Sequence, residues 1–236
     1  MALRAAVTSC LLLAACSDSE VELPAHPDDP IMSRALGESM MIDPDLTGQN
    51  QANAAISDGS RDGSLPPLNV SPDAISKARA EAIDQVGGLA EMRSIGSPAE
   101  VTGEDDQPLP PTLVARMAKS KFVTGECAGK ASYTTAWAAR MPEALPVYPH
   151  GAVQSAAGIA GGTCSTKAVN FRTPVPLPDV LDFYFTKAAK AGFKTEFSQI
   201  GGEQVLSGKK GGESFAVYAR TVSAGIAGID LVTSGI

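Results

Sequence analysis

The chain has 236 residues, a formal net charge of −7 and only 5% aromatic residues, a size that suits one or two domains. No apolar run approaches the roughly 20 residues of a membrane-spanning helix, so we expect no such span. Residues 17–112 carry 18 acidic and 5 basic side chains, whereas residues 113–236 carry 8 acidic and 13 basic ones. Because all twelve aromatic residues lie at Phe122 or later, only the second segment is expected to bury a core.

The first 15 residues are typical of a secretory signal peptide, with Arg4 followed by a short apolar run from Ala5 to Ala15. The run ends in Leu13-Ala14-Ala15-Cys16, which resembles the lipobox of bacterial lipoproteins. The resemblance implies that the mature chain begins at Cys16 and is anchored by lipid on its sulfur, on the periplasmic face of a bacterial membrane. Ser17 after the cysteine slightly favours the outer membrane by resemblance to known sorting rules. The alternative is an ordinary signal peptide with a chance cysteine.

Residues 16–112 are predicted to form an acidic, largely disordered tether, because the segment repels itself and has no large rings to bury. One helix is expected within it, at residues 72–86. Ser71 suits the N-cap, Pro72 the first turn, and Asp73 complements the helix dipole. The apolar stripe of this helix is rich in alanine, so a marginal or docked helix is expected; it comprises Ile75, Ala78, Ala82, Ile83 and Val86.

Residues 113–236 are predicted to form the periplasmic domain, and they contain two of the four cysteines, Cys127 and Cys164. In an oxidising compartment such a pair indicates a structural disulfide. A redox site would normally show a Cys-x-x-Cys spacing, which is absent. Zinc ligation would need further ligands, and His150 is the nearest histidine.

The fold class expected for this domain is α+β, with an antiparallel sheet and one main helix packed on it. A short helix is predicted over Leu113–Thr124 and the main helix over Pro178–Ala191. Glycine pairs between the later strands indicate antiparallel hairpins. The predicted strands are Tyr133–Trp137, Ala152–Ala157, Lys167–Arg172, Phe193–Ser198, Gln204–Gly208, Ser214–Thr221 and Ile229–Val232.

One residue of the main helix does not follow its apolar stripe. Val180, Leu181, Tyr184, Phe185 and Ala188 share the face that should cover the sheet. Phe183 instead projects between Lys187 and Lys190. It either packs beneath a loop or the helix at 72–86, or forms an exposed aromatic contact that binds a partner together with Lys187 and Lys190.

The sequence offers little chemistry, so we expect no enzyme, no metal and no cofactor. The two histidines are His26, in the tether, and His150, and no Gly-x-Ser-x-Gly elbow is present. The stretch from Gly125 to Ala131 is superficially similar to a phosphate loop, but its spacing is wrong. Basic residues are scattered and the expected compartment lacks nucleic acid, so no nucleic-acid partner is expected.

Four stretches together resemble a group of uncharacterised alphaproteobacterial lipoproteins, to which no activity is attached. They are Trp137–Pro149, Asn170-Phe171, Asp182–Phe185 and Gly228–Val232. The resemblance supports the expected architecture and adds nothing on mechanism. From the lipobox and the lack of catalytic groups, we expect a lipid-anchored cell-envelope protein whose domain is a non-catalytic interaction module. Its partner would be an envelope protein or an anionic envelope surface. The alternative is a carrier that binds a small apolar ligand or lipid between helix and sheet, beside Phe183, Tyr184 and Phe185.

Overall fold

The computed structural model describes residues 68–103, 106–120, 123, 125–161 and 164–236. The predicted lipidation site at Cys16, the signal peptide and residues 17–67 lie outside the described residues. None of the helices in the described ranges is both long and apolar enough to cross a membrane.

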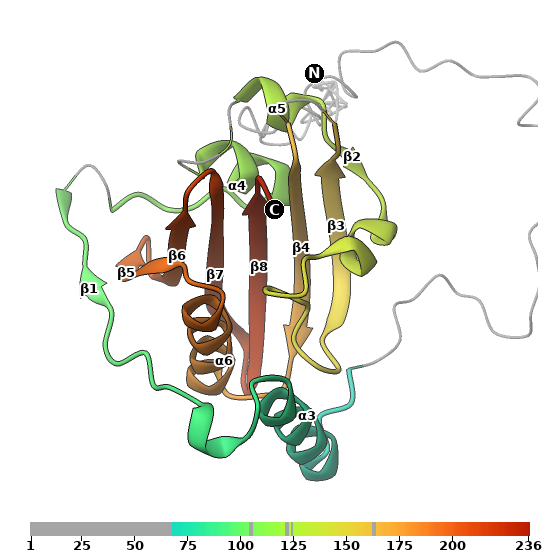
Figure 1. Ribbon diagram of the computed structural model, residues 1–236, viewed down its shortest axis with the longest axis vertical. Coiled ribbons are helices and arrows are strands. Elements are labelled where there is room, and N and C mark those ends of the chain that lie inside the picture. The colour runs from blue at the N-terminus through green and yellow to red at the C-terminus, as the bar shows by residue number, and fades with distance from the viewer. Residues whose placement is uncertain (1–67, 104–105, 121–122, 124, 162–163) are drawn as a thin grey trace, which may run out of the picture.

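A single sheet of eight strands forms the centre of the fold, in the order β1-β5-β6-β7-β8-β4-β3-β2 (Figure 1). The short β1 runs parallel to β5, and all other neighbours are antiparallel. The sheet is therefore mixed, and the predicted combination of sheet and helix is confirmed only at that coarser level. The strands are β1 (Ala99–Glu100), β2 (Ser132–Tyr133), β3 (Ala152–Ile159), β4 (Thr166–Thr173), β5 (Lys194–Ile200), β6 (Glu203–Lys210), β7 (Glu213–Ser223) and β8 (Ile226–Ser234).

The last four strands form the predicted hairpins, joined by glycine turns. Gly201 and Gly202 between β5 and β6 both have positive φ, at 57° and 80°. A turn with two positive φ values matches the twist of the strands that it joins, and glycine adopts it without a steric penalty. The three hairpins bring Val205, Tyr218 and Asp230 into one row across the sheet.

One face of the sheet is covered by α6 (Leu177–Lys190), with α3 (Pro72–Gln85) beside it (Figure 1). Strand residues facing this side alternate with those facing the other, as the period of two requires. The core beneath α6 consists of large apolar side chains that are fully buried. It includes Leu181, Phe183, Tyr184, Leu206, Phe215, Val217, Ile229 and Leu231.

The helix α3 is docked on the domain. Its N-cap is the predicted one, because the Ser71 hydroxyl accepts a hydrogen bond from the Ala74 amide at 3.2 Å. Ala78 and Ala82 are buried in the same core as Phe183. The short η1 (Leu89–Glu91) and an extended segment then lead to β1.

The domain boundary predicted at residue 113 is therefore wrong, since the folded body already includes α3. The backbone after α3 is bonded to α6, with the Arg93 amide donating to Thr186 Oγ1 at 2.9 Å and the Ile95 amide to Asp182 Oδ1 at 2.8 Å. The small alanine side chains of α3 let the helix pack closely on the core. The composition of residues 16–112, taken as a whole, indicated disorder and did not reveal this packing. Residues 68–236 hold 16 acidic and 16 basic side chains, so the docked segment cancels the positive charge expected of the domain.

The opposite face of the sheet is partly covered by α4 (Leu113–Lys119) and α5 (Gly125–Gly129). The helix α4 is shorter than its predicted range. The predicted disulfide between Cys127 and Cys164 is confirmed, and it ties α5 to the segment just before β4. Both faces of the sheet therefore have helical cover.

The predicted strand at Tyr133–Trp137 is wrong beyond Tyr133. After the two residues of β2, the chain forms the 3-10 helix η3 (Thr135–Arg140). The Thr134 hydroxyl caps it by accepting from the Ala136 amide. The indole of Trp137 lies against Gly158 of β3, where a Cβ atom would come within 2.6 Å of the ring. The ring thus packs where β3 has no side chain, and this contact overrides local strand propensity.

Candidate functional site

A row of polar side chains crosses the α4 face of the sheet on four adjacent strands. The cross-strand register pairs Ser155 of β3 with Asn170 of β4, Asn170 with Asp230 of β8, and Asp230 with Tyr218 of β7. Directly opposed residues of one sheet face are close neighbours. The register therefore brings together four polar residues that are up to 75 positions apart in the sequence.

The guanidinium of Arg116, on α4, is at the centre of a buried ion network. It binds Glu203 of β6 through two parallel hydrogen bonds of 2.7 Å each. Its Nε lies 3.2 Å from Asp230 Oδ2, and the Arg116 side chain is only 3% exposed. Burial alone would lower the pKa of Arg116, but the Glu203 hydrogen bonds and the charge of Asp230 together raise it. Arg116 therefore stays charged.

Asp230 has both carboxylate oxygens engaged. Arg220 Nη1 lies 2.6 Å from Oδ2, and Asn170 Nδ2 donates to Oδ1 at 2.5 Å. Arg220 also approaches Glu203, at 3.6 Å. Two arginines thus balance two carboxylates, which is the condition under which buried charges are tolerated.

Tyr218 packs against this network from the same sheet face. The guanidinium carbon of Arg116 lies 5.6 Å from the centre of its ring, within the range of a cation–π contact. Burial raises the pKa of Tyr218 to about 12. Its hydroxyl is therefore protonated at neutral pH and does not act there as a proton acceptor.

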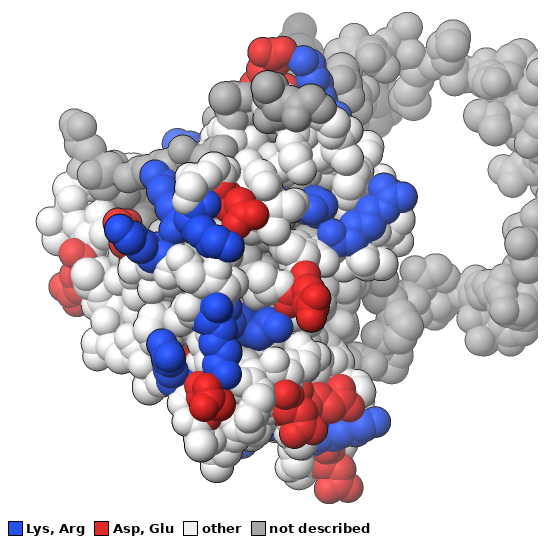
Figure 2. Space-filling model, in the orientation of Figure 1, with Lys and Arg blue, Asp and Glu red and all other residues white. Residues whose placement is uncertain are grey.

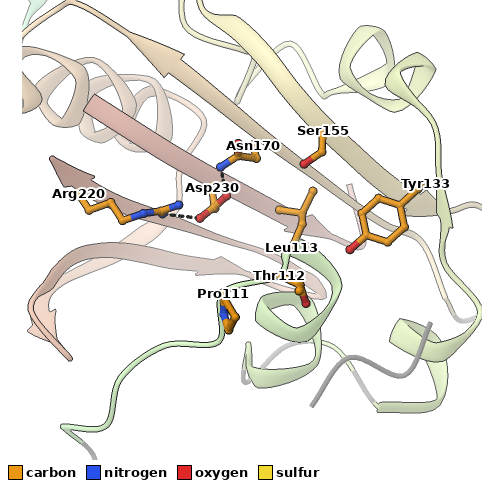
Figure 3. Close-up of a pocket in the computed structure, with 8 residues that line it drawn as sticks. All are labelled: Pro111, Thr112, Leu113, Tyr133, Ser155, Asn170, Arg220 and Asp230. Carbon is orange, nitrogen blue, oxygen red and sulfur yellow. Dashed lines mark hydrogen bonds and ion pairs between the residues drawn. The ribbon is translucent and has the colours of Figure 1, made fainter. Parts of the chain in front are cut away.

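A pocket of about 430 Å³ opens beside the network (Figure 3). Figure 3 shows Tyr133 and Ser155 on one side, Arg220 and Asp230 on the other, and the start of α4 as a third wall. Tyr133 is 45% exposed, and its hydroxyl accepts a hydrogen bond from the Val114 amide at 3.3 Å. The lining residues are Pro111, Thr112, Leu113, Tyr133, Ser155, Asn170, Arg220 and Asp230.

The chemistry of this pocket suits recognition. Asp230 fixes the positions of Asn170 and Arg220, because each of its carboxylate oxygens contacts one of these side chains. Among the described residues, the Ser155 hydroxyl and the Asn170 side-chain oxygen have no hydrogen-bond partner. They are available to a bound molecule, and a few such placed polar groups fix the orientation of ligands in protein pockets.

His150, the histidine weighed as a catalytic or zinc candidate, lines a different pocket of about 500 Å³, near the start of α3. Its φ of 56° is in the left-handed region, and its Nε2 lies 2.9 Å from Glu81 Oε1 of α3. This side-chain contact links the loop before β3 to α3. The structure does not bring His150 to the polar row.

The prediction of an exposed contact at Phe183 is wrong, because this side chain is fully buried. Its ring centre lies 5.1 Å from those of Tyr148 and Tyr184, in edge-to-face contacts. The alternative expectation, packing beneath the helix at 72–86, is confirmed, since α3 contributes to the same core. The polar side of α6, with Asp182, Thr186 and Lys190, is hydrogen-bonded to the segment that follows α3.

The two lysines predicted to flank this contact have other roles. Lys190 donates to the Val86 carbonyl at 2.7 Å and pairs with Glu91 at 2.7 Å, so it helps to hold the docked segment. Lys187 is partly exposed. Figure 2 shows that acidic side chains lie beside most of the basic ones on this face, so no patch of a single sign covers it.

The site residues that the sequence analysis missed are Arg116, Asn170, Glu203, Arg220 and Asp230. One signal could have pointed to three of them. Asp230 interrupts the apolar run Ile229-Asp230-Leu231-Val232, and Arg220 and Glu203 likewise border buried strand positions. Charges inside strands that are covered on both faces must find partners.

Neither a metal-binding cluster nor a similar protein identifies the ligand of this site. In the described ranges, no three side chains of His, Cys, Asp or Glu gather in a way that could hold a metal ion. Comparison with models of protein families, with curated proteins and with solved structures gives no match.

Proposed function

We propose that this protein is a lipid-anchored binding module of the bacterial cell envelope, held to a membrane by lipid on Cys16. Its folded body recognises another envelope component and performs no chemistry. The observation that carries the binding role is the pocket over the charge-balanced network, with polar groups held in place at its floor. The membrane anchor rests on the lipobox resemblance.

The paired state of the network supports recognition over catalysis. A general acid or base needs a titratable group within hydrogen-bond reach of the reacting atom. In this pocket the carboxylate of Asp230 is committed to Arg116, Arg220 and Asn170. Moving a proton onto it would break an ion network that is otherwise neutral.

The disulfide supports an oxidising compartment. Cys127 and Cys164 join α5 to the segment just before β4 across 37 positions of sequence, and such bonds persist outside the cytosol. This agrees with secretion through a signal peptide.

Membrane fractionation combined with labelling by a fatty-acid analogue tests the anchor. We expect wild-type protein in the membrane fraction with the label attached, and Cys16→Ser unlabelled and released or unprocessed. Cys10→Ser is the matched control, because it removes a cysteine of the signal peptide and leaves the lipobox intact. Unchanged labelling and membrane association of Cys16→Ser would refute the anchor.

Cross-linking in the native envelope tests the binding module. We expect one or a few cross-linked envelope components with wild-type protein, and their loss with Tyr133→Ala, which removes an exposed wall of the pocket. Leu89→Ala is the control, since Leu89 is 73% exposed and does not line the pocket. Equal cross-linking by both variants would place recognition outside the pocket.

A carrier role for an apolar ligand between helix and sheet has weaker support. Phe183 and Tyr184 are fully buried in the core, and the Tyr184 hydroxyl donates to the Pro146 carbonyl at 2.8 Å. These side chains fill the space that the ligand would need. An extractable lipid seen by native mass spectrometry would favour this alternative.

A further inference from the structure

We infer that the pocket lined by Tyr133, Ser155, Asn170, Arg220 and Asp230 binds an uncharged sugar unit. This inference deepens the proposed binding role and rests on it. It names the class of ligand from the charge, the free hydrogen-bonding groups and the exposed ring that the pocket presents.

The charge balance of the pocket disfavours an ionic ligand. Arg220 lines the pocket and Arg116 belongs to the same ion network, and both are paired with Asp230 and Glu203. A ligand carboxylate or phosphate would have to compete with these internal carboxylates, and a ligand amine with the internal guanidinium groups. Burying a charge without a partner of its own is costly, so a neutral ligand fits best.

The free groups of the pocket call for a ligand with both donors and acceptors. The Ser155 hydroxyl both donates and accepts, the Asn170 Oδ1 accepts, and the Arg220 guanidinium has N–H groups besides the one on Asp230. These groups come from β3, β4 and β7, so they are spread across the floor. A sugar hydroxyl donates and accepts at once, and several adjacent hydroxyls match such a spread.

The wall at Tyr133 suits the apolar face of a sugar ring. Tyr133 is 45% exposed although it is a large aromatic residue, and its hydroxyl is held by the Val114 amide, which fixes the ring at the pocket mouth (Figure 3). Leu113 and Pro111 extend this apolar wall. A volume of about 430 Å³ is near the lower end of the range for small-molecule sites, as one or two sugar rings would need.

Saturation-transfer NMR on the full-length protein, in a zwitterionic detergent without a sugar headgroup, tests the inference. The probes form two matched pairs, D-glucose with D-glucuronate and N-acetyl-D-glucosamine with D-glucosamine. We expect transfer to at least one uncharged sugar at millimolar concentration. Its charged analogue should bind at least about tenfold more weakly, the equivalent of losing one good hydrogen bond.

Variants locate the binding within the pocket. Tyr133→Leu removes the ring, and Ser155→Ala removes one floor hydroxyl. Each should weaken sugar binding by about tenfold. Leu89→Ala, at an exposed residue outside the pocket, should bind like wild type. A correctly folded state of each variant is verified by its circular dichroism spectrum.

Three outcomes would overturn the inference. The first is no transfer to either uncharged sugar, the second is tighter binding of the charged analogues, and the third is binding that Tyr133→Leu and Ser155→Ala leave unchanged. None of them bears on the lipid anchor or on cross-linking to an envelope protein. Failure of the sugar assignment is therefore distinguishable from failure of the proposed function.

Discussion

The face of the sheet beneath α6 is packed with aliphatic and aromatic side chains, whereas two arginines and two carboxylates lie between the other face and α4. Phe215, Leu206 and Ile229 on the first face are fully buried. On the second face Arg116 and Asp230 are buried to nearly the same degree, each with a side chain only 3% exposed. The side chains of the two faces are thus buried to a similar degree, but those of the first face are apolar and those of the second are charged.

The two faces therefore have different roles. Apolar burial is non-directional and roughly proportional to area, so the α6 face stabilises the fold without prescribing the position of single atoms. Hydrogen-bonded ion pairs are directional. The α4 face fixes where Asn170 and Arg220 lie, and the pocket forms beside them. The predictions that follow test this division.

The largest effect is expected on the apolar face. Phe215→Ala should lower the free energy of unfolding by about 4 kcal/mol, the typical cost of truncating a buried phenylalanine. Phe215 is fully buried, and its ring meets that of Phe193 at 5.2 Å. Urea unfolding followed by circular dichroism measures the change. Leu89→Ala is the exposed control and should stay within about 0.5 kcal/mol. A loss below 1 kcal/mol at Phe215 would contradict the role of this face.

Breaking the ion network should be nearly as costly. Arg116→Met leaves Glu203 and Asp230 with Arg220 as the remaining cation of the network, and we expect a loss of about 3 kcal/mol. The double variant Arg116→Met/Glu203→Gln lacks one charge of each sign, so it should recover part of the lost free energy of unfolding. The same unfolding experiment on single and double variants gives the coupling. If the double variant is as unstable as the sum of the single variants, the pair is not energetically coupled.

The polar face should also contribute to the dependence of stability on alkaline pH. The pKa of Tyr218 is raised from 10.0 to about 12, first of all by burial, so the folded state holds its proton where the unfolded state has lost it. This contribution is complete below pH 10 and is lost as the pH rises toward 12, with a slope of up to about 1.4 kcal/mol per pH unit.

Tyr218→Phe should therefore flatten the decline of stability between pH 10 and pH 12, measured by urea unfolding at each pH. The decline should not vanish, because burial also raises the pKa of Tyr148 and of Tyr184 on the other face. Tyr133→Phe, at an exposed tyrosine, is the control. An identical decline in Tyr218→Phe and wild type would show that Tyr218 does not contribute.

The smallest effect is expected at the exposed ion pair that helps to dock α3. The side chains of Arg79 and Asp179 are 46% and 35% exposed, and such pairs contribute about 0.2–1 kcal/mol. Arg79→Ala should therefore lower the melting temperature slightly at low salt, and the difference should shrink as salt screens the pair. If Arg79→Ala destabilised the fold as much as Arg116→Met, α3 docking would depend on this ion pair rather than on Ala78 and Ala82.

Several features followed from local sequence alone. The four C-terminal strands, their glycine turns and the helix after Pro176 depend on short-range patterns, with alternation in the strands, positive φ in the turns and an apolar stripe on the helix. The disulfide followed from counting the cysteines that remain if the first 16 residues are a lipoprotein signal, as the sequence predicts. The Ser71 cap of α3 was also visible, because capping is a contact within one turn.

Other features required tertiary contacts. Whether α3 docks, and so whether Phe183 is covered, depends on the fit of two helices that are about 100 residues apart. Trp137 leaves the strand pattern because Gly158, on another strand, has no side chain there.

The ion network and its pocket also depend on tertiary contacts. The charged residues of the network lie on four separate elements, and no local pattern in the sequence links them; they are Arg116, Glu203, Arg220 and Asp230. Only the register of β6, β7, β8 and β4 brings Glu203, Arg220, Asp230 and Asn170 to one face beneath α4. The physical reason is that composition and periodicity report which side of an element is buried, whereas a binding site depends on which buried sides meet.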